Sequence, residues 1–161
     1  MAVDSFLKLD GIKGESQDHK HKDEIDVLAW SWGIRQEGSF HYRGGGGSGK
    51  ADFQDLSFTK EIDKSSPILM LHCATGKHIK EGTLVLRKAG GKELEYLKVK
   101  MEDIIVSNVT TAGSDDGSRL PTESISLNFA KITIDYQQQG KDGGAQGGPV
   151  NFNYDIRGNV K

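Results

Sequence analysis

The chain has 161 residues, one cysteine and a formal net charge of −2 at pH 7. This length suits a single domain over residues 1–161 whose core needs no metal, and the lone Cys73 excludes an intrachain disulfide. The near-zero charge argues against nonspecific binding to nucleic acid or anionic membranes, and no apolar run approaches the roughly 18 residues of a membrane-spanning helix.

The N-terminal region predicts a short strand followed by a polar loop. Residues Val3 to Leu9 alternate loosely, and the start of the chain lacks the basic and apolar regions of a conventional signal peptide. The loop from Glu15 to Glu24 holds His19 and His21, an H-x-H pair. Because no cysteine or second spaced pair accompanies them, we interpret this segment as a solvated loop and predict no metal site.

Residues Ile25 to Ile34 form the clearest early strand. Large apolar side chains occupy every second position: Leu28, Trp30, Trp32 and Ile34. This alternation predicts that the large side chains pack into a core, while a face of small residues that includes Ser31 meets solvent, a channel or a neighbouring backbone. Residues Gln36 to Tyr42 are expected to return as a partner strand.

A glycine-rich segment, Arg43 to Ala51, nearly matches a phosphate-binding loop. Gly44, Gly49 and Lys50 have the required spacing. However, Ala51 stands where a magnesium-binding Ser or Thr is needed, and the next segment has the pattern of a strand instead of a helix start. We therefore predict a flexible hairpin tip that binds no nucleotide.

The segment Asp52 to Thr59 predicts the return strand. Its apolar phase slips between Phe53 and the pair Leu56 and Phe58. A slip of one residue moves side chains to the other face of a sheet, so a bulge is expected near Gln54.

One short helix is predicted at about residues 66–75. Ser66 is a suitable N-cap, Pro67 fits the first helical position, and Gly76 offers a left-handed stop. Apolar residues fall all around this helix: Ile68, Leu69, Met70, Leu71, Cys73 and Ala74. Such a helix must be covered on more than one side, either by deep burial in its own domain or by its own sheet together with another subunit.

Two long strands near the C-terminal half change their apolar face once. In the first strand, Leu97, Val99 and Met101 share one face, and the later residues Ile104 and Val106 lie on the other. In the second strand, Ile125, Leu127 and Phe129 share one face, and the later residues Ile132, Ile134 and Tyr136 lie on the other. Each strand therefore needs a bulge or bend near its middle, as strands that serve two sheets do.

The remaining segments complete a β fold. Thr83 to Arg87 predicts a short strand and Val150 to Ile156 a last one, with exposed loops at Ala112 to Thr122 and Gly140 to Pro149. The pattern favours a mainly β fold, an antiparallel β-barrel or sandwich of about eight strands with one short flanking helix.

No catalytic constellation stands out in the sequence. Ser65 and Ser66 lack a G-x-S-x-G turn, and His72 and Cys73 are adjacent, so on a helix they point about 100° apart and form no nucleophile–base pair. We predict no enzyme activity and no cofactor. A hydrolase, the opposing hypothesis, would depend on His72, Cys73 or Asp115.

Several long motifs carry a family resemblance over essentially the whole chain. They are FLKLDGIKGES at Phe6 to Ser16, EIDVLAWSWG at Glu24 to Gly33, LSFTKEIDKSSPILM at Leu56 to Met70, CATGKHI at Cys73 to Ile79, RKAGG with EYL at Arg87 to Leu97, and SLNFAKI at Ser126 to Ile132. In this order they resemble the haemolysin-coregulated protein (Hcp) family, the inner-tube subunits of the type VI secretion system.

The resemblance implies a β-barrel with a flanking helix that assembles as homohexameric rings. Stacked rings would form a tube inside a contractile sheath, capped by a spike protein, carrying small effectors in the lumen and leaving the bacterial cytoplasm without a cleaved signal peptide. A small-ligand or carbohydrate-binding β-barrel, expected to be monomeric with an apolar pocket, is the alternative.

The resemblance also implies two sites. Ser31 would lie on the lumen surface that effectors touch. An extended loop would contact a neighbouring subunit or ring through Gly44, Gly45, Gly46, Gly47, Ser48, Gly49 and Lys50.

Overall fold

The computed structural model describes residues 3–38, 49–88, 93–115, 117 and 120–161, and these residues form ten strands and one helix. The strands are β1 (Val3–Leu9), β2 (Ile25–Asp26), β3 (Ala29–Ser31), β4 (Ile34–Arg35), β5 (Asp52–Phe53), β6 (Leu56–Glu61), β7 (Ile79–Lys88), β8 (Leu94–Ala112), β9 (Thr122–Tyr136) and β10 (Val150–Asp155), and the helix is α1 (Ser66–Thr75).

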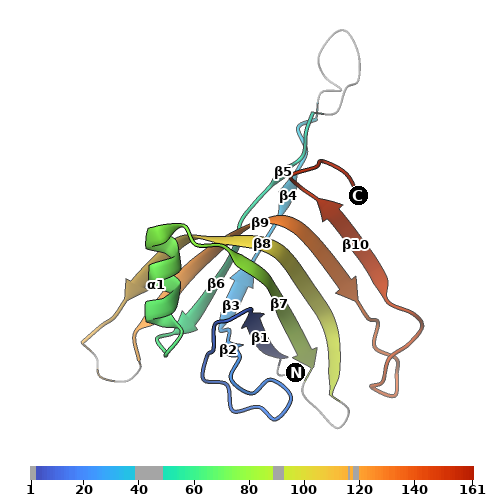
Figure 1. Cartoon of the computed structure of the whole chain (residues 1–161). Helices are drawn as coiled ribbons and strands as arrows, with labels where there is room; N and C mark the ends of the chain where they lie inside the picture. The colour runs from blue at the N-terminus through green and yellow to red at the C-terminus, as the bar shows by residue number, and fades with distance from the viewer. Residues whose placement is uncertain (1–2, 39–48, 89–92, 116, 118–119) are drawn as a thin grey trace.

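Eight of these strands form one antiparallel sheet in the order β2-β1-β7-β8-β9-β6-β3, with β10 also paired to β9. The sheet curls into a half-barrel, and α1 lies across one side of it, packed against β8 (Figure 1). This architecture confirms the predicted mainly β fold with a single short helix. The strand predicted at Thr83 to Arg87 extends further, because Ile79 already pairs with Ile104.

The two long strands, β8 and β9, bend at one shared line. Met101 pairs with Ile132 and Ile104 pairs with Phe129, and all four side chains are buried. On each strand, two residues lie between these buried positions, whereas a regular strand that buries one face has a single residue between them. Both strands therefore change their buried face at the same place, and the pairing register between them is unchanged. Asp103 lies at this line with a positive φ of 55°. The predicted change of face is thus confirmed, and its physical form is a bend of the sheet.

Beyond the bend, β8 and β9 have different neighbours. Before Ile104, β8 pairs with β7, and the C-terminal part of β9 pairs with β10. On the other side, the first part of β9 pairs with β6, which in turn pairs with β3. We call the four-stranded unit made of β3, β6, residues 122–128 of β9 and residues 105–112 of β8 the serine half-sheet, after the residues it presents.

The core lies inside the half-barrel. Its fully buried members come from six strands and the helix: Leu7, Ile25, Leu56, Leu69, Leu84, Met101, Ile104, Ile125, Leu127 and Ile132. Each large apolar side chain buried in this way stabilises the fold by roughly 1.5–3 kcal/mol relative to exposure. The core therefore depends mainly on the long strands, with Leu69 fastening α1 to them.

The helix begins one residue away from the expected cap. Ser65 occupies the N-cap position and makes no side-chain capping bond, while Ser66 is the first helical residue. The Ser66 hydroxyl instead accepts a hydrogen bond from the Asp63 N–H at 3.0 Å and donates one to Glu123 at 2.7 Å. Gly76 ends the helix with a φ of 68°, as predicted.

The strand predicted at Ile25 to Ile34 is divided into β2, β3 and β4. Ile25 and Asp26 pair with β1, whereas Ala29 to Ser31 pair with β6. Because the segment changes its partner strand between Asp26 and Ala29, the alternation of buried and exposed side chains does not continue from β2 into β3. Leu28 and Ile34 are therefore exposed, contrary to the prediction, and Val27 is buried in their place.

The interruption predicted near Gln54 is present between β5 and β6. The Gln54 N–H donates to the Gly33 carbonyl at 3.0 Å, and the Trp32 indole N–H donates to the Gln54 carbonyl at 2.9 Å. β4 and β5 pair with each other and form a separate two-stranded ribbon that leads away from the main sheet (Figure 1). Of the predicted partner strand, residues 36–38 form no strand, and residues 39–42 lie outside the described part.

The prediction of a solvated histidine loop is wrong for one of the two histidines. His19 is exposed, but His21 is 6% exposed and its ring stacks on Phe6. Both nitrogens of His21 contact carboxylates, one of them on β8. Nothing in the local sequence marks a partner 74 residues away in the chain.

Candidate functional site: the serine face

Two rows of small side chains cross the serine half-sheet. The register aligns the first row as Ser31, Ser57, Ser126 and Asn108, and the second as Ala29, Thr59, Ser124 and Thr110. Directly paired residues of antiparallel strands project to the same side of a sheet. These eight residues therefore share one surface, which we call the serine face.

The period of the strands explains why this face is polar. The residues between the two rows, Trp30, Phe58 and Ile125, pair across the same strands and pack into the core on the opposite side. Strict alternation then leaves the small residues on the outer side. The hydroxyl groups of Ser57 and Ser126 are hydrogen-bonded at 3.0 Å, so two polar side chains of this face are linked across neighbouring strands.

Ser31 lies in a shallow hollow of this face. The hollow has a volume of about 260 Å³ and is also lined by Ala29, Ser57, Thr59 and Ser124. Its small hydroxyl-bearing side chains offer hydrogen bonds without a strong charge.

Asp55 borders the serine face and was not singled out from the sequence. Its carboxylate accepts a hydrogen bond from the Ser107 hydroxyl at 2.6 Å and one from the Asn128 amide at 2.8 Å. The partners lie 52 and 73 residues away along the chain, so no local pattern could indicate the cluster. Asp55 directly precedes β6, so these two hydrogen bonds hold the start of β6 close to both β8 and β9.

The serine half-sheet has an open edge on each side within the described part of the chain. β3 ends the strand order and pairs with β6 alone. On the other side, the pairing of β7 with β8 reaches only to Ile104, so residues 105–112 of β8 pair with β9 alone. Open edges expose backbone N–H and C=O groups that can pair with another strand.

Large apolar side chains are exposed near α1. Leu71 is 61% exposed, and Ile68 and Met70 on the same helix are also exposed. Leu28 and Leu120, 59% and 58% exposed, lie at a neighbouring pocket. An exposed apolar group of this kind is typical of a contact surface.

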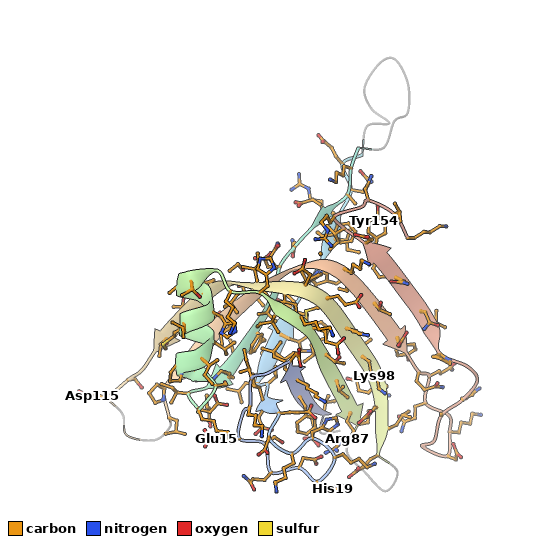
Figure 2. The ribbon with its side chains drawn as sticks, viewed as in Figure 1. Glu15, His19, Arg87, Lys98, Asp115 and Tyr154 are labelled. Atoms are coloured by element: carbon orange, nitrogen blue, oxygen red, sulfur yellow. The ribbon has the colours of Figure 1, made fainter. Side chains whose placement is uncertain are left out.

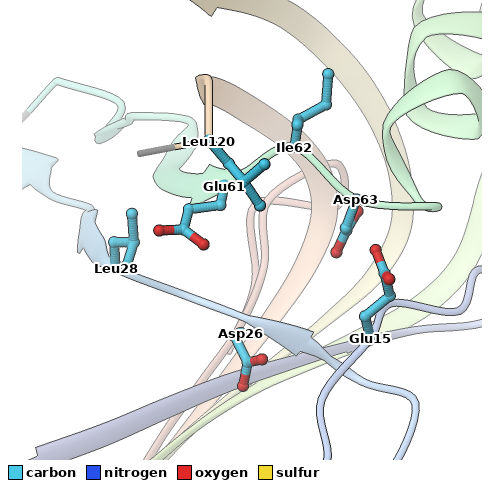
Figure 3. Close-up of a pocket in the computed structure, with 7 residues that line it drawn as sticks. All are labelled: Glu15, Asp26, Leu28, Glu61, Ile62, Asp63 and Leu120. Atoms are coloured by element: carbon cyan, nitrogen blue, oxygen red, sulfur yellow. The ribbon is translucent and has the colours of Figure 1, made fainter. Parts of the chain in front are cut away.

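This pocket has a volume of about 250 Å³ and combines apolar with acidic side chains. Besides the two leucines it is lined by Glu15, Asp26, Glu61, Ile62 and Asp63, whose positions Figure 3 shows. Burial raises the pKa of Asp26 above its ordinary value, and neighbouring carboxylates add to this effect.

The structure places the sequence-predicted residues in different surroundings. Ser31 lies on the serine face, and Gly49 and Lys50 are exposed residues before β5. The other members of the predicted contact loop, Gly44 to Ser48, lie outside the described residues.

The residues considered for a hydrolase are not brought together as a site. His72 is buried, and its Nδ1–H donates to the Ile68 carbonyl at 2.8 Å within α1. Cys73 is half-buried, and Asp115 lies in the exposed connection between β8 and β9 (Figure 2). Among the described residues, no group of three or more His, Cys, Asp or Glu side chains could hold a metal ion, and no helix is long and apolar enough to cross a membrane.

A family model identifies the class of protein to which this half-barrel with its flanking helix belongs. The model described as "Type VI secretion system effector, Hcp" matches residues 6–136, so the chain belongs to the Hcp family of type VI secretion system tube proteins. Members of this family are structural proteins, and the chain is accordingly not an enzyme.

Individual relatives agree over the full length. Protein hcp1 of Pseudomonas aeruginosa is 54% identical over 162 residues, which cover 100% of this chain and 99% of that protein. The crystal structure of Hcp1 from Salmonella typhimurium superposes with a TM-score of 0.80 at 41% identity, covering 100% of this chain and 99% of that one. A structure described as a type six secretion system protein reaches a TM-score of 0.92 at 30% identity, with 98% of each chain covered.

Proposed function

We propose that this chain, as one domain over residues 1–161, closes into homohexameric rings whose central channel is lined by the serine face. The observation that carries this proposal is a half-sheet with a polar face and an open edge on each side. The two edges are different strands, β3 and β8, so a contact between them is heterologous. Heterologous contacts repeat from copy to copy and form a ring when the rotation between neighbouring copies closes. The number six is what membership of the Hcp family implies.

A hydrated channel explains the small polar residues. Edge-to-edge pairing would continue the sheet around the ring and keep the serine face on one side of it throughout. Ser31 would then touch the small effectors carried in the lumen. Weak, evenly distributed hydrogen bonds would hold such a cargo and still let it leave.

The apolar surface of α1 supports a contact between neighbouring copies. Leu69 is buried against the chain's own core, whereas Leu71 on another side of the helix is exposed. Of the two alternatives left by the sequence, coverage by a second subunit therefore fits better than deep burial within one chain. Apolar area removed from water would stabilise the ring by about 25 cal/mol per Å² before the costs of association.

The stacking of rings is proposed to involve the loop Gly44 to Lys50. The ribbon of β4 and β5 leads away from the sheet (Figure 1). Gly49 and Lys50, the members of this loop that the structure describes, are exposed and directly precede Ala51 and β5. The stacked tube would lie inside the contractile sheath, carry a spike protein at its tip, and be expelled from the bacterial cytoplasm. Deleting residues 45–48 is expected to shorten the stacks and leave single rings intact.

Native mass spectrometry with negative-stain imaging of the full chain tests the proposal. The expected result is a particle of six copies with a central hole. A monomer at high concentration that binds a small ligand or sugar saturably would contradict it and support the alternative ligand-binding barrel.

A further inference from the structure

The ribbon of β4 and β5 is not paired with the main sheet. Ile34 pairs with Phe53 and Arg35 with Asp52, and among the described residues neither strand joins the eight-stranded sheet. A two-stranded antiparallel pair is at best marginally stable in water on its own. The direction in which the ribbon leaves the half-barrel (Figure 1) therefore depends on the side chains that hold its base.

Two hydrogen bonds at this base join the two chain segments of the ribbon to each other. The Gln54 N–H donates to the Gly33 carbonyl at 3.0 Å, and the Trp32 indole N–H donates to the Gln54 carbonyl at 2.9 Å. A Cβ on Gly33 would lie only 3.0 Å from the side-chain oxygen of Gln54, so the two segments approach closely. These contacts close the base, but they do not fix the direction of the ribbon relative to β9 and β10.

Aromatic side chains connect the base with the rest of the molecule. The Trp32 ring centroid lies 6.4 Å from that of Phe129 on β9 and 6.5 Å from that of Phe152 on β10. Within the described ribbon, Phe53 takes part: its ring lies 4.9 Å from Tyr154 on β10 and 6.3 Å from Trp32. Aromatic rings attract one another at centroid separations of about 4.5–7 Å. Phe53 is thus the ring that holds the ribbon against β10, and we call these five residues the aromatic cluster.

Tyr154 is itself held in place. Its hydroxyl donates to the Asn159 side-chain oxygen at 2.8 Å. Asn159 lies in the turn after β10, where Asp155 and Val160 exchange two backbone hydrogen bonds, of 2.7 and 3.1 Å. Along β10, the rings of Tyr154 and Phe152 are stacked with an interplanar angle of 7°. Tyr154, labelled in Figure 2, therefore presents a fixed ring to the ribbon.

We propose that Phe53 and Tyr154 are positioning residues: their contact fixes the direction of the ribbon and thereby the place of Gly49 and Lys50, which are exposed just before β5. This inference rests on the proposed stacking role of the loop to which those two residues belong. Stacked rings need the loops of all copies to project in the same way, because a copy whose ribbon turns aside loses its contact with the next ring. The aromatic cluster meets this need without a further pairing of strands.

Electron spin resonance distances in the full chain test the positioning. Spin labels at Arg35→Cys on β4 and Lys100→Cys on β8, in a chain that carries Cys73→Ser and is diluted with unlabelled copies, report the direction of the ribbon. The parent should give a narrow distribution of distances. Phe53→Ala removes two aromatic contacts, and each lost pair shifts the equilibrium away from the seated ribbon by roughly 2- to 10-fold, so the distribution should broaden.

Further variants separate the ring contact from a general loss of packing. Tyr154→Leu removes the ring that Phe53 meets and should broaden the distances in the same way, whereas Tyr154→Phe keeps the ring and should retain a narrow distribution. Val150→Ala trims an apolar side chain at the start of β10 that is 70% exposed and lies outside the aromatic cluster, so it should change nothing. An unchanged distribution in both Phe53→Ala and Tyr154→Leu would overturn the proposal.

The lengths of stacks in negative-stain images, at equal protein concentration, connect the position of the ribbon with assembly. Phe53→Ala should form rings as the parent does but lose the stacks, and deletion of residues 45–48 should have the same effect. If the deletion variant keeps its stacks, the proposed role of the loop fails, and the distances alone decide whether Phe53 and Tyr154 set the direction of the ribbon. If the deletion abolishes stacks while Phe53→Ala displaces the ribbon and keeps them, the inference about stacking is wrong.

Discussion

The ammonium of Lys60 lies 2.8 Å from the carboxylate of Glu123, and both side chains are fully buried. The same ammonium contacts Asp63 at 2.8 Å and the Ser66 hydroxyl at 2.9 Å, and the other carboxylate oxygen of Glu123 accepts from Thr111. A cation beside the start of a helix is unfavourable unless carboxylates compensate it. This cluster therefore ties the beginning of α1 to β6 and β9, which orients the helix face proposed to contact a neighbouring copy.

Breaking this buried pair on one side is expected to be costly. Lys60→Met would leave two carboxylates without their cation, which typically costs about 3–5 kcal/mol in the free energy of unfolding. The double variant Lys60→Met with Glu123→Leu should recover much of that loss, since it removes the two fully buried charges and leaves only the partly exposed Asp63 without its cation. Urea denaturation measures both.

The matched control is an exposed ion pair of the same kind. Lys100 and Glu81 are 3.6 Å apart and about half-exposed, so Lys100→Met should cost less than about 1 kcal/mol. A loss of equal size at Lys60 and Lys100 would show that burial does not govern the Lys60 pair.

The exposed helix face is expected to govern assembly. Leu71→Lys introduces a charge at a position that is 61% exposed in one chain, so the fold of the subunit should be unaffected. If a second copy covers this position, the charge would be buried without a partner, and sedimentation should show single chains in place of rings. Val160→Lys, at another exposed apolar residue, should still form rings; ring formation by Leu71→Lys would remove α1 from the interface.

A large side chain on the serine face should reduce the binding of cargo without affecting ring assembly. Ser31→Tyr adds bulk to the hollow at the proposed lumen, and we expect retention of a small effector to be lost while ring size is unchanged. Co-purification of effector with the ring measures retention. Asn153→Tyr places the same bulk on an exposed position of β10 and should retain effector. Equal retention by both variants would argue against the role of Ser31.

The bend of the sheet depends on an unusual backbone conformation at Asp103. A β-branched residue at its positive φ is strained, so Asp103→Val should lower the free energy of unfolding by about 1–3 kcal/mol, and Asp103→Gly should cost less. Thermal unfolding of the two variants gives the comparison. Greater stability of the valine variant would show that the bend tolerates ordinary backbone geometry.

Acid should weaken the contacts of Asp103. A hydrogen bond from His78, helped by Arg157, holds the pKa of Asp103 below its ordinary value. The ionised form is favoured by the fold, so its stabilising effect is present above the ordinary carboxyl pKa and fades as the pH falls through the lowered one. In Asp103→Asn this part of the acid dependence should vanish from melting temperatures measured between pH 2 and 6.

Periodic patterns made much of this fold predictable. The alternating residues of β8 and β9 indicated both the strands and the place where their buried side changes, and Gly76 marked the end of α1. These features depend on neighbours within one element, which the sequence displays directly.

Long-range partners account for what the sequence did not reveal. The division of the strand at Ile25 to Ile34 follows from a change of partner, and the burial of His21 follows from a carboxylate on β8. Likewise Ser66 fails as an N-cap because its hydroxyl is engaged by Glu123 across the sheet. The polar character of Ser31 was visible, but the rows that surround it appear only when three further strands are in register.

The pairing of open edges between copies is the central claim, and amide hydrogen exchange tests it most directly. In β8, residues 105–112 pair with β9 alone, so the alternate amides that point away from β9 have no strand partner among the described residues. The account predicts that these amides, together with those of β3, exchange slowly in the assembled protein and rapidly in Leu71→Lys as a single chain. Equal exchange in the two states would mean that the edges stay open, and the proposed ring would be wrong.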